Sequence, residues 1–156
     1  MTNKEVLELF ELYHYDIYRL AYSFTGSHQD AEDVVQSTFL KLLEKQPGLQ
    51  PGKEKAWLMQ VTANHCRNIL KSSWKKRTDV FNLNVHETFE SAEQTELFFA
   101  VMELPAKERV AVHLHYYEGY SMEEIAEILK LSSSAISMRL HRARKHLKQF
   151  LKENQV

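Results

Sequence analysis

The chain has 156 residues, of which 44% are hydrophobic, and a formal net charge of −1. This length suits one ordinary domain or two small helical ones. No apolar run reaches the roughly 18 residues that a membrane span requires, and the first residues lack the basic-then-apolar pattern of a secretory signal. The single cysteine, Cys66, excludes an intrachain disulfide and is typical of a reducing compartment. We therefore expect a soluble protein of the cytoplasm.

The near-neutral total hides blocks of opposite charge. Residues 51–78 carry seven basic and one acidic side chain, and residues 132–156 carry six and one. The segments 1–50 and 79–131 are instead acidic, with net charges of −4 and −8. Two separated basic blocks indicate two surfaces that contact phosphate, although a solvated helix face would explain either block taken alone.

Two helices are predicted at the start of the chain. Residues 4–25 carry apolar side chains at helical spacing, and Gly26 ends this helix. Ser27 is placed to cap a second helix that runs to about Lys45. A loop with two prolines and two glycines follows at 46–52.

A third helix, expected over residues 53–76, has two different faces. One is apolar and consists of Leu58, Met59, Val61, Ala63, His65, Cys66, Ile69 and Leu70. The other is a narrow seam of amides, bases and one aromatic ring, made of Trp57, Gln60, Asn64, Arg67, Asn68, Lys71 and Lys75. Such groups hold unstacked single-stranded bases beside a phosphate backbone. A solvated polar face fits the same spacing, and Trp57 also fits a core position.

The sequence of the second half predicts four more helices. They follow a segment at 78–91 that lacks a helical pattern. Their expected ranges are 92–103, 105–118 with Pro105 in its first turn, 121–130 and 133–152.

The last two of these helices form a distinctive pair. Ser121 with Glu124 predicts a capping box, and Ser132 is placed to cap the final helix. That helix would bury Ile136 and Leu140 and turn a polar, basic face outward. A short helix, a tight turn and a capped basic helix predict a helix-turn-helix, whose second helix lies in a DNA major groove. An amphipathic hairpin in an ordinary helical protein is the alternative.

Three blocks of the chain, in this order, resemble the extracytoplasmic-function (ECF) sigma factors of bacterial RNA polymerase. The blocks are HQDAEDVVQSTFLKLLE at 28–44, AWLMQVTANHCRNILKSSWKKR at 56–77 and LPAKERVAVHLHYYEGYSMEEIAEILKLSSSAISMRLHRARKHL at 104–147. The resemblance implies an all-α protein with a three-helix domain at 1–77, a linker at 78–91 and a four-helix domain with a helix-turn-helix at 92–156. It implies a factor that binds core RNA polymerase and directs promoter-specific initiation by recognising the −35 element and melting the −10 element.

The resemblance also implies a role for each matching residue. The polymerase would be bound by Asp33, Gln36 and Leu40, which lie away from the apolar stripe of their helix. The seam on the third helix would bind the −10 strand, with Asn64 at the place of a pocket for a flipped base. The −35 duplex would be read by Ser133, Ser134, Ser137, Met138, His141, Arg142 and Lys145.

One departure from the family affects the −35 face. The family often has a Gly-Thr-Val-Lys-Ser-Arg run where this chain has Ser-Ala-Ile-Ser-Met-Arg at 134–139. Ser137 therefore replaces a lysine, and Met138 offers an apolar contact. The −35 sequence does not follow from the resemblance.

The implied partners are core RNA polymerase, duplex −35 DNA, single-stranded −10 DNA and an anti-sigma factor, which in this family is often membrane-anchored. We expect no catalytic residue, metal, cofactor or small-molecule substrate. His113 and His115 point in different directions on a helix, and no nucleophile elbow or phosphate-binding glycine loop occurs.

Two other classes of protein share some of these features. A stand-alone DNA-binding regulator would use its first half to sense a ligand or dimerise, but would not need the strip at Asp33, Gln36 and Leu40. A protein-interaction module without a DNA role is disfavoured by the basic blocks.

Overall fold

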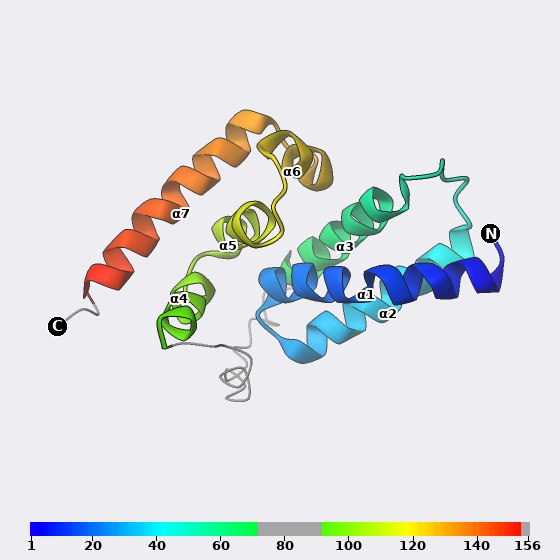
Figure 1. The fold of residues 1–156 in the computed structure, drawn as a ribbon, viewed down its shortest axis with the longest axis horizontal. Helices are drawn as coiled ribbons and strands as arrows, with labels where there is room; N and C mark the ends of the chain where they lie inside the picture. Colours follow the sequence, from blue (N-terminus) through cyan, green and yellow to red (C-terminus); the bar gives the residue numbers. More distant parts are fainter. Residues whose placement is uncertain (72–91, 154–156) are drawn as a thin grey trace. The chain divides into compact units, whose positions relative to one another are not determined.

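The computed structural model describes residues 1–71 and 92–153, with side chains given from residue 96 onward in the second range. In these two ranges every regular element is a helix and there is no strand, so the prediction of an all-α fold is confirmed (Figure 1). The described helices divide into two compact units, the first made mainly of residues 1–71 and the second mainly of residues 92–153. None of the described helices is long and apolar enough to cross a membrane.

The first unit is a bundle of three helices that all contact one another, α1 (Asn3–Thr25), α2 (His28–Lys45) and α3 (Glu54–Lys71). α1 begins with a capping box, in which the Thr2 hydroxyl accepts from the Glu5 N–H at 3.1 Å and the Glu5 carboxylate accepts from the Thr2 N–H at 3.4 Å. The helix ends at Gly26, whose φ of 65° lies in the left-handed region that glycine adopts without steric cost. The start and end of this helix are therefore determined by local sequence.

The core of the first unit is apolar, with two buried threonines. Thr62 donates its hydroxyl proton to the Leu58 carbonyl at 2.7 Å, and the Thr38 hydroxyl lies 3.5 Å from that of Thr62. Both threonines are fully buried, but both hydroxyls have partners, which avoids the cost of an unsatisfied polar group. The largest fully buried side chains around them are Ile17, Leu20, Val34, Leu42, Leu58 and Met59.

The second unit contains α4 (Ala92–Met102), α5 (Ala106–Val112), the π-helical turn η3 (His113–Tyr117), α6 (Met122–Leu129) and α7 (Ser133–Glu153). α4 and α5 both pack against α7. The buried apolar side chains of these helices include Ala100, Leu104, Val110, Ala111, Leu114, Ile125, Leu129, Ile136, Leu140 and Ala143. The helices predicted at 92–103, 121–130 and 133–152 are present within one or two residues of their expected ends.

The predicted helix at 105–118 differs from the structure in two respects. Pro105 is the N-cap and not a first-turn residue, because its ψ of 146° is extended. The α-helix also changes at His113 to a π-helical turn, in which the Glu118 N–H donates to the His113 carbonyl at 3.0 Å. This wider turn brings His113 Nε2 within 3.3 Å of Glu118 Oε1, both largely buried. The bend leads through Gly119, at φ 77°, into α6.

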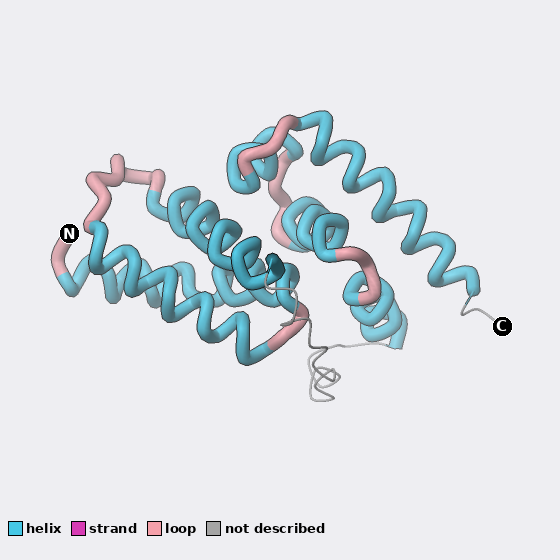
Figure 2. Tube along the Cα trace, turned by 180° about the vertical axis from the view of Figure 1, so that it is seen from behind, coloured by secondary structure: helices cyan, strands magenta, loops and turns pink. Residues whose placement is uncertain are grey.

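The predicted helix-turn-helix is present in α6 and α7, and Figure 2 shows the short loop that joins them. The Ser121 hydroxyl accepts from the Glu124 N–H at 3.1 Å and the Glu124 carboxylate accepts from the Ser121 N–H at 3.0 Å. The Ser132 hydroxyl accepts from the Ala135 N–H at 3.1 Å at the start of α7. Both predicted caps are confirmed, so the start of each helix is set by its own sequence.

Lys130 occupies a position in this turn that usually favours glycine. Its φ is 56°, in the left-handed region, and the Leu131 N–H donates to the Ala126 carbonyl at 2.9 Å. This bond closes a Schellman motif, whose left-handed residue is most often glycine because a Cβ there crowds the backbone. The turn therefore carries some backbone strain that the sequence pattern did not predict.

We expect the Lys130→Gly variant to be more stable than Lys130→Ala by about 1 kcal/mol, because only glycine relieves the left-handed strain. Comparison of these two variants removes the effect of the lost charge. Thermal unfolding followed by circular dichroism would measure the difference. Equal stability of the two variants would contradict the backbone explanation.

Candidate functional site

The α2 strip, defined as Asp33, Gln36 and Leu40, is exposed to solvent in the first unit. Leu40 has 57% of its surface exposed, whereas the opposite face of the helix is buried at Ala31, Val34, Val35, Thr38 and Leu42. Leu43, three residues after Leu40, is also exposed and was not predicted, although its spacing could have identified it. Large apolar side chains with so much exposed area are common at protein–protein contacts when they lie together. The strip is therefore free to contact a partner.

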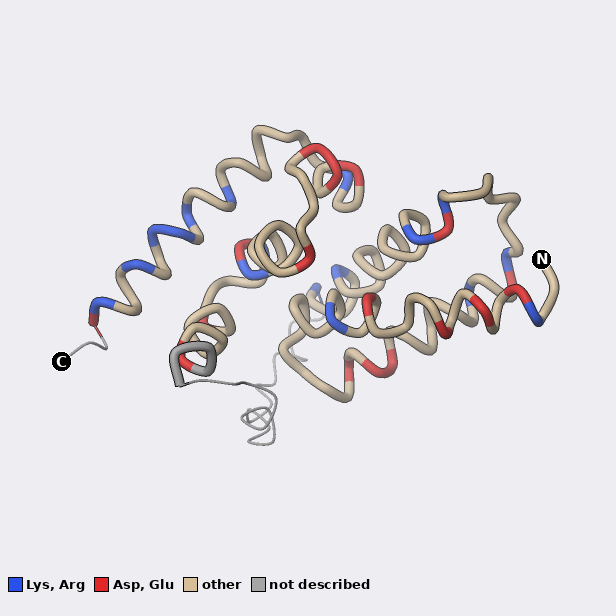
Figure 3. Tube along the Cα trace, viewed as in Figure 1, with Lys and Arg blue, Asp and Glu red and all other residues tan. Residues whose placement is uncertain are grey.

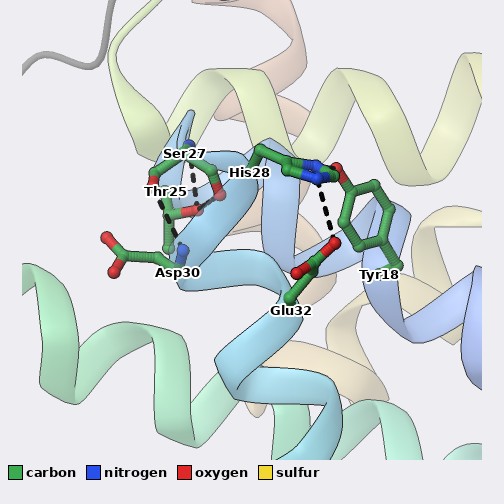
Figure 4. Close-up of polar contacts among 6 residues, drawn as sticks. All are labelled: Tyr18, Thr25, Ser27, His28, Asp30 and Glu32. Carbon is green, nitrogen blue, oxygen red and sulfur yellow. Dashed lines mark hydrogen bonds and ion pairs between the residues drawn. The ribbon is translucent and has the colours of Figure 1, made fainter.

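The corner between α1 and α2 holds the start of the helix that carries this strip (Figure 4). The Thr25 hydroxyl accepts from the Ser27 N–H at 3.2 Å, and the Ser27 hydroxyl accepts from the Asp30 N–H at 3.1 Å. These two bonds satisfy backbone donors that the helix itself cannot pair. The corner thus fixes the direction in which α2 leaves α1.

A second set of contacts in Figure 4 links the same two helices through side chains. Tyr18 is hydrogen-bonded to His28 Nδ1, and His28 Nε2 lies 2.9 Å from Glu32 Oε1. Burial, with the nearby Tyr22 and Glu32, raises the pKa of Tyr18 to about 12. The phenol therefore keeps its proton and can donate it to His28 Nδ1. His28 and Glu32 are exposed, so this series of contacts orients side chains beside the α2 strip but adds little to the stability of the unit.

The α3 seam, defined as Trp57, Gln60, Asn64, Arg67, Asn68, Lys71 and Lys75, is largely accessible. Asn64, Asn68 and Lys71 are exposed, and Trp57, Gln60 and Arg67 are half-buried. Lys75 and the end of the predicted helix at 76 lie outside the described residues. The described members therefore share one accessible face, as the spacing predicted.

Asn64 is held in place by a neighbour on its own helix. Arg67 donates to Asn64 Oδ1 at 3.4 Å, one turn further along α3. This contact uses one of the two acceptor lone pairs of the amide oxygen, so the other lone pair and the amide nitrogen stay available for a ligand. A restrained amide loses less rotamer freedom when it binds than a free one.

The apolar face predicted for α3 is correct at its centre and wrong at its end. Leu58, Met59 and Ala63 are buried as expected, and Cys66 lies among them with its pKa raised to about 12 by burial. Leu70, in contrast, is 41% exposed. Leu70 therefore adds an apolar group to the accessible surface of the helix.

His65 lies between the buried and accessible faces of α3, and its Nε2 atom is buried without a hydrogen-bond partner among the described residues. Burial lowers the pKa of His65, and the charge of Lys41 lowers it further. The folded first unit therefore favours the neutral imidazole, whereas the unfolded chain takes up a proton below pH 6.5.

We expect the first unit to lose stability as the pH falls from 6.5 towards the lowered pKa of folded His65. Above pH 6.5 this group should cause no further change of stability with pH. His65→Leu should reduce this slope. Trp57 lies in α3, so its fluorescence in a Trp74→Phe background follows this unit during urea unfolding. The same slope in wild type and variant would show that another group is responsible.

The α7 face consists of Ser133, Ser134, Ser137, Met138, His141, Arg142 and Lys145, all of which are exposed. The opposite side of the helix buries Ile136, Leu140 and Ala143. Figure 3 shows the basic residues of α7 from its middle to its C-terminal end, while its first turn carries none. The described geometry matches a helix whose polar first turns face bases and whose later turns face phosphates.

Two tertiary contacts, neither predicted from sequence, hold α7 in its unit. His146 Nδ1 lies 2.6 Å from Glu108 Oε1, and Glu108 is largely buried. Arg144 donates to the Tyr116 hydroxyl at 2.8 Å, from α7 to η3. Neither Arg144 nor His146 belongs to the α7 face, so the two contacts position the helix without using the residues of that face.

The described residues contain no group of three or more metal-ligating side chains placed to hold an ion. His113 and His115 have different partners, since His113 contacts Glu118 and His115 Nδ1 bonds to the Tyr120 carbonyl at 2.8 Å. The two rings therefore do not converge on a common point.

Two family models match the chain, one described as Sigma-70 region 2 over residues 9–76 and one as Sigma-70, region 4 over residues 95–147. The ECF RNA polymerase sigma factor SigE of Mycolicibacterium smegmatis is 30% identical over 86% of this chain, which spans 57% of that relative's length. The ECF RNA polymerase sigma factor EcfG of Rhodopseudomonas palustris is 30% identical over a region that covers 84% of this chain and 76% of the length of EcfG. The sigma factor RpoE of Bartonella quintana, solved with the anti-sigma factor NepR, aligns with a TM-score of 0.72 and 26% identity over 97% of this chain and 99% of its own.

Proposed function

Because this chain belongs to the ECF family of bacterial RNA polymerase sigma factors, we propose that its three exposed surfaces divide promoter recognition between them. Promoter-specific initiation of transcription is the function of the chain as a sigma factor. In the proposal, the α2 strip docks on core RNA polymerase, the α3 seam holds the melted −10 strand and the α7 face reads the −35 duplex.

The observation that supports this assignment is that exposed residues and buried residues lie on opposite sides of the same helix. In α2, α3 and α7 the described residues assigned to a partner are exposed or half-buried, and the core residues lie on the other side. Direct contacts from the α7 face would supply specificity, and Arg67, Lys71, Lys75, Arg142, Arg144, Lys145 and Lys148 would supply phosphate affinity.

We also propose an anti-sigma partner and a cytoplasmic location for this chain. An anti-sigma factor covers the surfaces that bind polymerase and DNA; the solved relative in complex with NepR supports this kind of partner. The chain performs no chemistry itself, because the polymerase that it joins forms the phosphodiester bonds. It acts in the cytoplasm, where a bacterial chromosome is transcribed.

In vitro transcription with purified core polymerase on a library of candidate promoters tests the proposal. We expect transcripts from a defined subset of promoters only when the chain is added. A stand-alone regulator would bind duplex DNA but would not give core polymerase promoter-dependent initiation. Loss of promoter choice with intact polymerase binding would place the error in the DNA-binding surfaces.

A further inference from the structure

Met138 lies in the middle of the α7 face and is 54% exposed. Between residues 133 and 142, all of which the structure describes, it is the one large apolar side chain exposed to solvent. Ser134 precedes it by one turn, Ser137 is adjacent, and His141 and Arg142 follow by one turn. An isolated exposed methionine is ordinary on a protein surface, but this one is surrounded by the polar residues of a helix-turn-helix.

The side chains around Met138 are short on its N-terminal side. Ser133, Ser134 and Ser137 each end one atom beyond Cβ, whereas the methionine side chain extends three atoms beyond it. Met138 therefore projects farther from the helix than these serines. A DNA groove that comes close to this part of α7 would contact the Met138 thioether before it contacts the serines. This part of the helix, just after the cap at Ser132, is the part that contacts base edges in helix-turn-helix proteins.

The chemistry of methionine selects one group among those in the major groove. Its sulfur is only a weak hydrogen-bond acceptor and the side chain has no donor, so it cannot replace the hydrogen bonds of a polar base edge. Thymine alone among the four bases presents a methyl group in the major groove. We infer that Met138 contacts the C5-methyl group of one thymine in the −35 duplex, which rests on the proposed role of the α7 face.

The position of that thymine is linked to the contact of Arg142. Four residues of helix rise about 6 Å, and successive base pairs are about 3.4 Å apart. The thymine read by Met138 therefore lies within about two base pairs of the base that Arg142 contacts.

The test uses the full chain assembled with core polymerase. Duplexes bound from a randomised library are sequenced, and each thymine of the selected −35 sequence is then replaced singly by deoxyuridine, which lacks only the methyl group. At one position wild-type affinity should fall about fourfold, the value of one buried methyl group. Met138→Ser should bind the thymine duplex as weakly as wild type binds the deoxyuridine duplex, and should not distinguish the two.

Two control variants separate this contact from general effects. Met138→Leu keeps an apolar side chain and should keep the preference for thymine. Leu12→Ala removes an exposed apolar side chain of α1, which is 65% exposed and outside the three surfaces, and should also keep it. The inference would be overturned if replacing thymine by deoxyuridine lowered the affinity of wild type and of Met138→Ser equally at every position. That result would leave the proposed function intact. Failure of the library to yield any preferred sequence would overturn both.

Discussion

Asp33→Arg and Leu40→Glu are each expected to abolish assembly of the chain with core RNA polymerase while its helices remain intact. Both residues are exposed, so neither substitution disturbs the core of the first unit. A charge placed in an apolar contact, or a reversed charge opposite a basic partner, leaves a buried group unpaired. We expect a loss of at least about a hundredfold in affinity, or about 3 kcal/mol.

Titration of labelled protein with purified core polymerase would measure this loss, and circular dichroism would confirm that the helices persist. Leu12→Glu is the matched control, because Leu12 is an exposed leucine of the same unit but lies on α1. It should assemble as the wild type does. Undiminished assembly of both α2 variants would remove the polymerase-binding role from the α2 strip.

Arg142→Ala should weaken binding of promoter duplex to the assembled polymerase by about 1–3 kcal/mol and relax base preference at one position, because a guanidinium can contact a base edge through two hydrogen bonds. Arg142 is exposed on the α7 face, and the buried side of its turn is formed by other residues. The loss should therefore appear in DNA binding and not in stability.

Lys148→Ala is the matched comparison on the same helix. Lys148 is exposed beyond the α7 face, so it should contribute to phosphate affinity alone. Its loss should weaken binding to all sequences alike and reduce the dependence of affinity on salt concentration. Uniform losses in both variants, with base preference preserved in each, would show that Arg142 does not read a base.

The helix boundaries and the two faces of most helices could be predicted because their causes are local. Ser27, Ser121 and Ser132 cap their helices through backbone groups three residues away, and Gly26 adopts the left-handed conformation that ends α1. Apolar spacing assigned the buried side of α2 and the exposed α2 strip on the other side. The same reasoning placed the described residues of the α3 seam on an accessible surface. On the α7 face it did so for Ser134, Met138, His141, Arg142 and Lys145, whereas Ser133 and Ser137 were assigned by the family resemblance.

Spacing alone did not predict every exposed side chain or every backbone conformation. Leu70 has the spacing of a core residue but is exposed, and the exposure of Leu43 was not predicted. The π-helical turn at 113–117 changes the spacing within a predicted α-helix. Lys130 adopts a conformation that its residue type disfavours, because the turn between α6 and α7 requires it.

The amino-acid sequence by itself therefore determined the helices, their caps and the family to which the chain belongs, since these depend on neighbouring residues and on ordered blocks of sequence. Only the tertiary structure decided how each helix is held within its unit. The bond between His146 and Glu108 joins residues 38 positions apart, and Tyr18 meets His28 from a different helix. No spacing within one helix encodes such pairs, because each depends on how two helices pack.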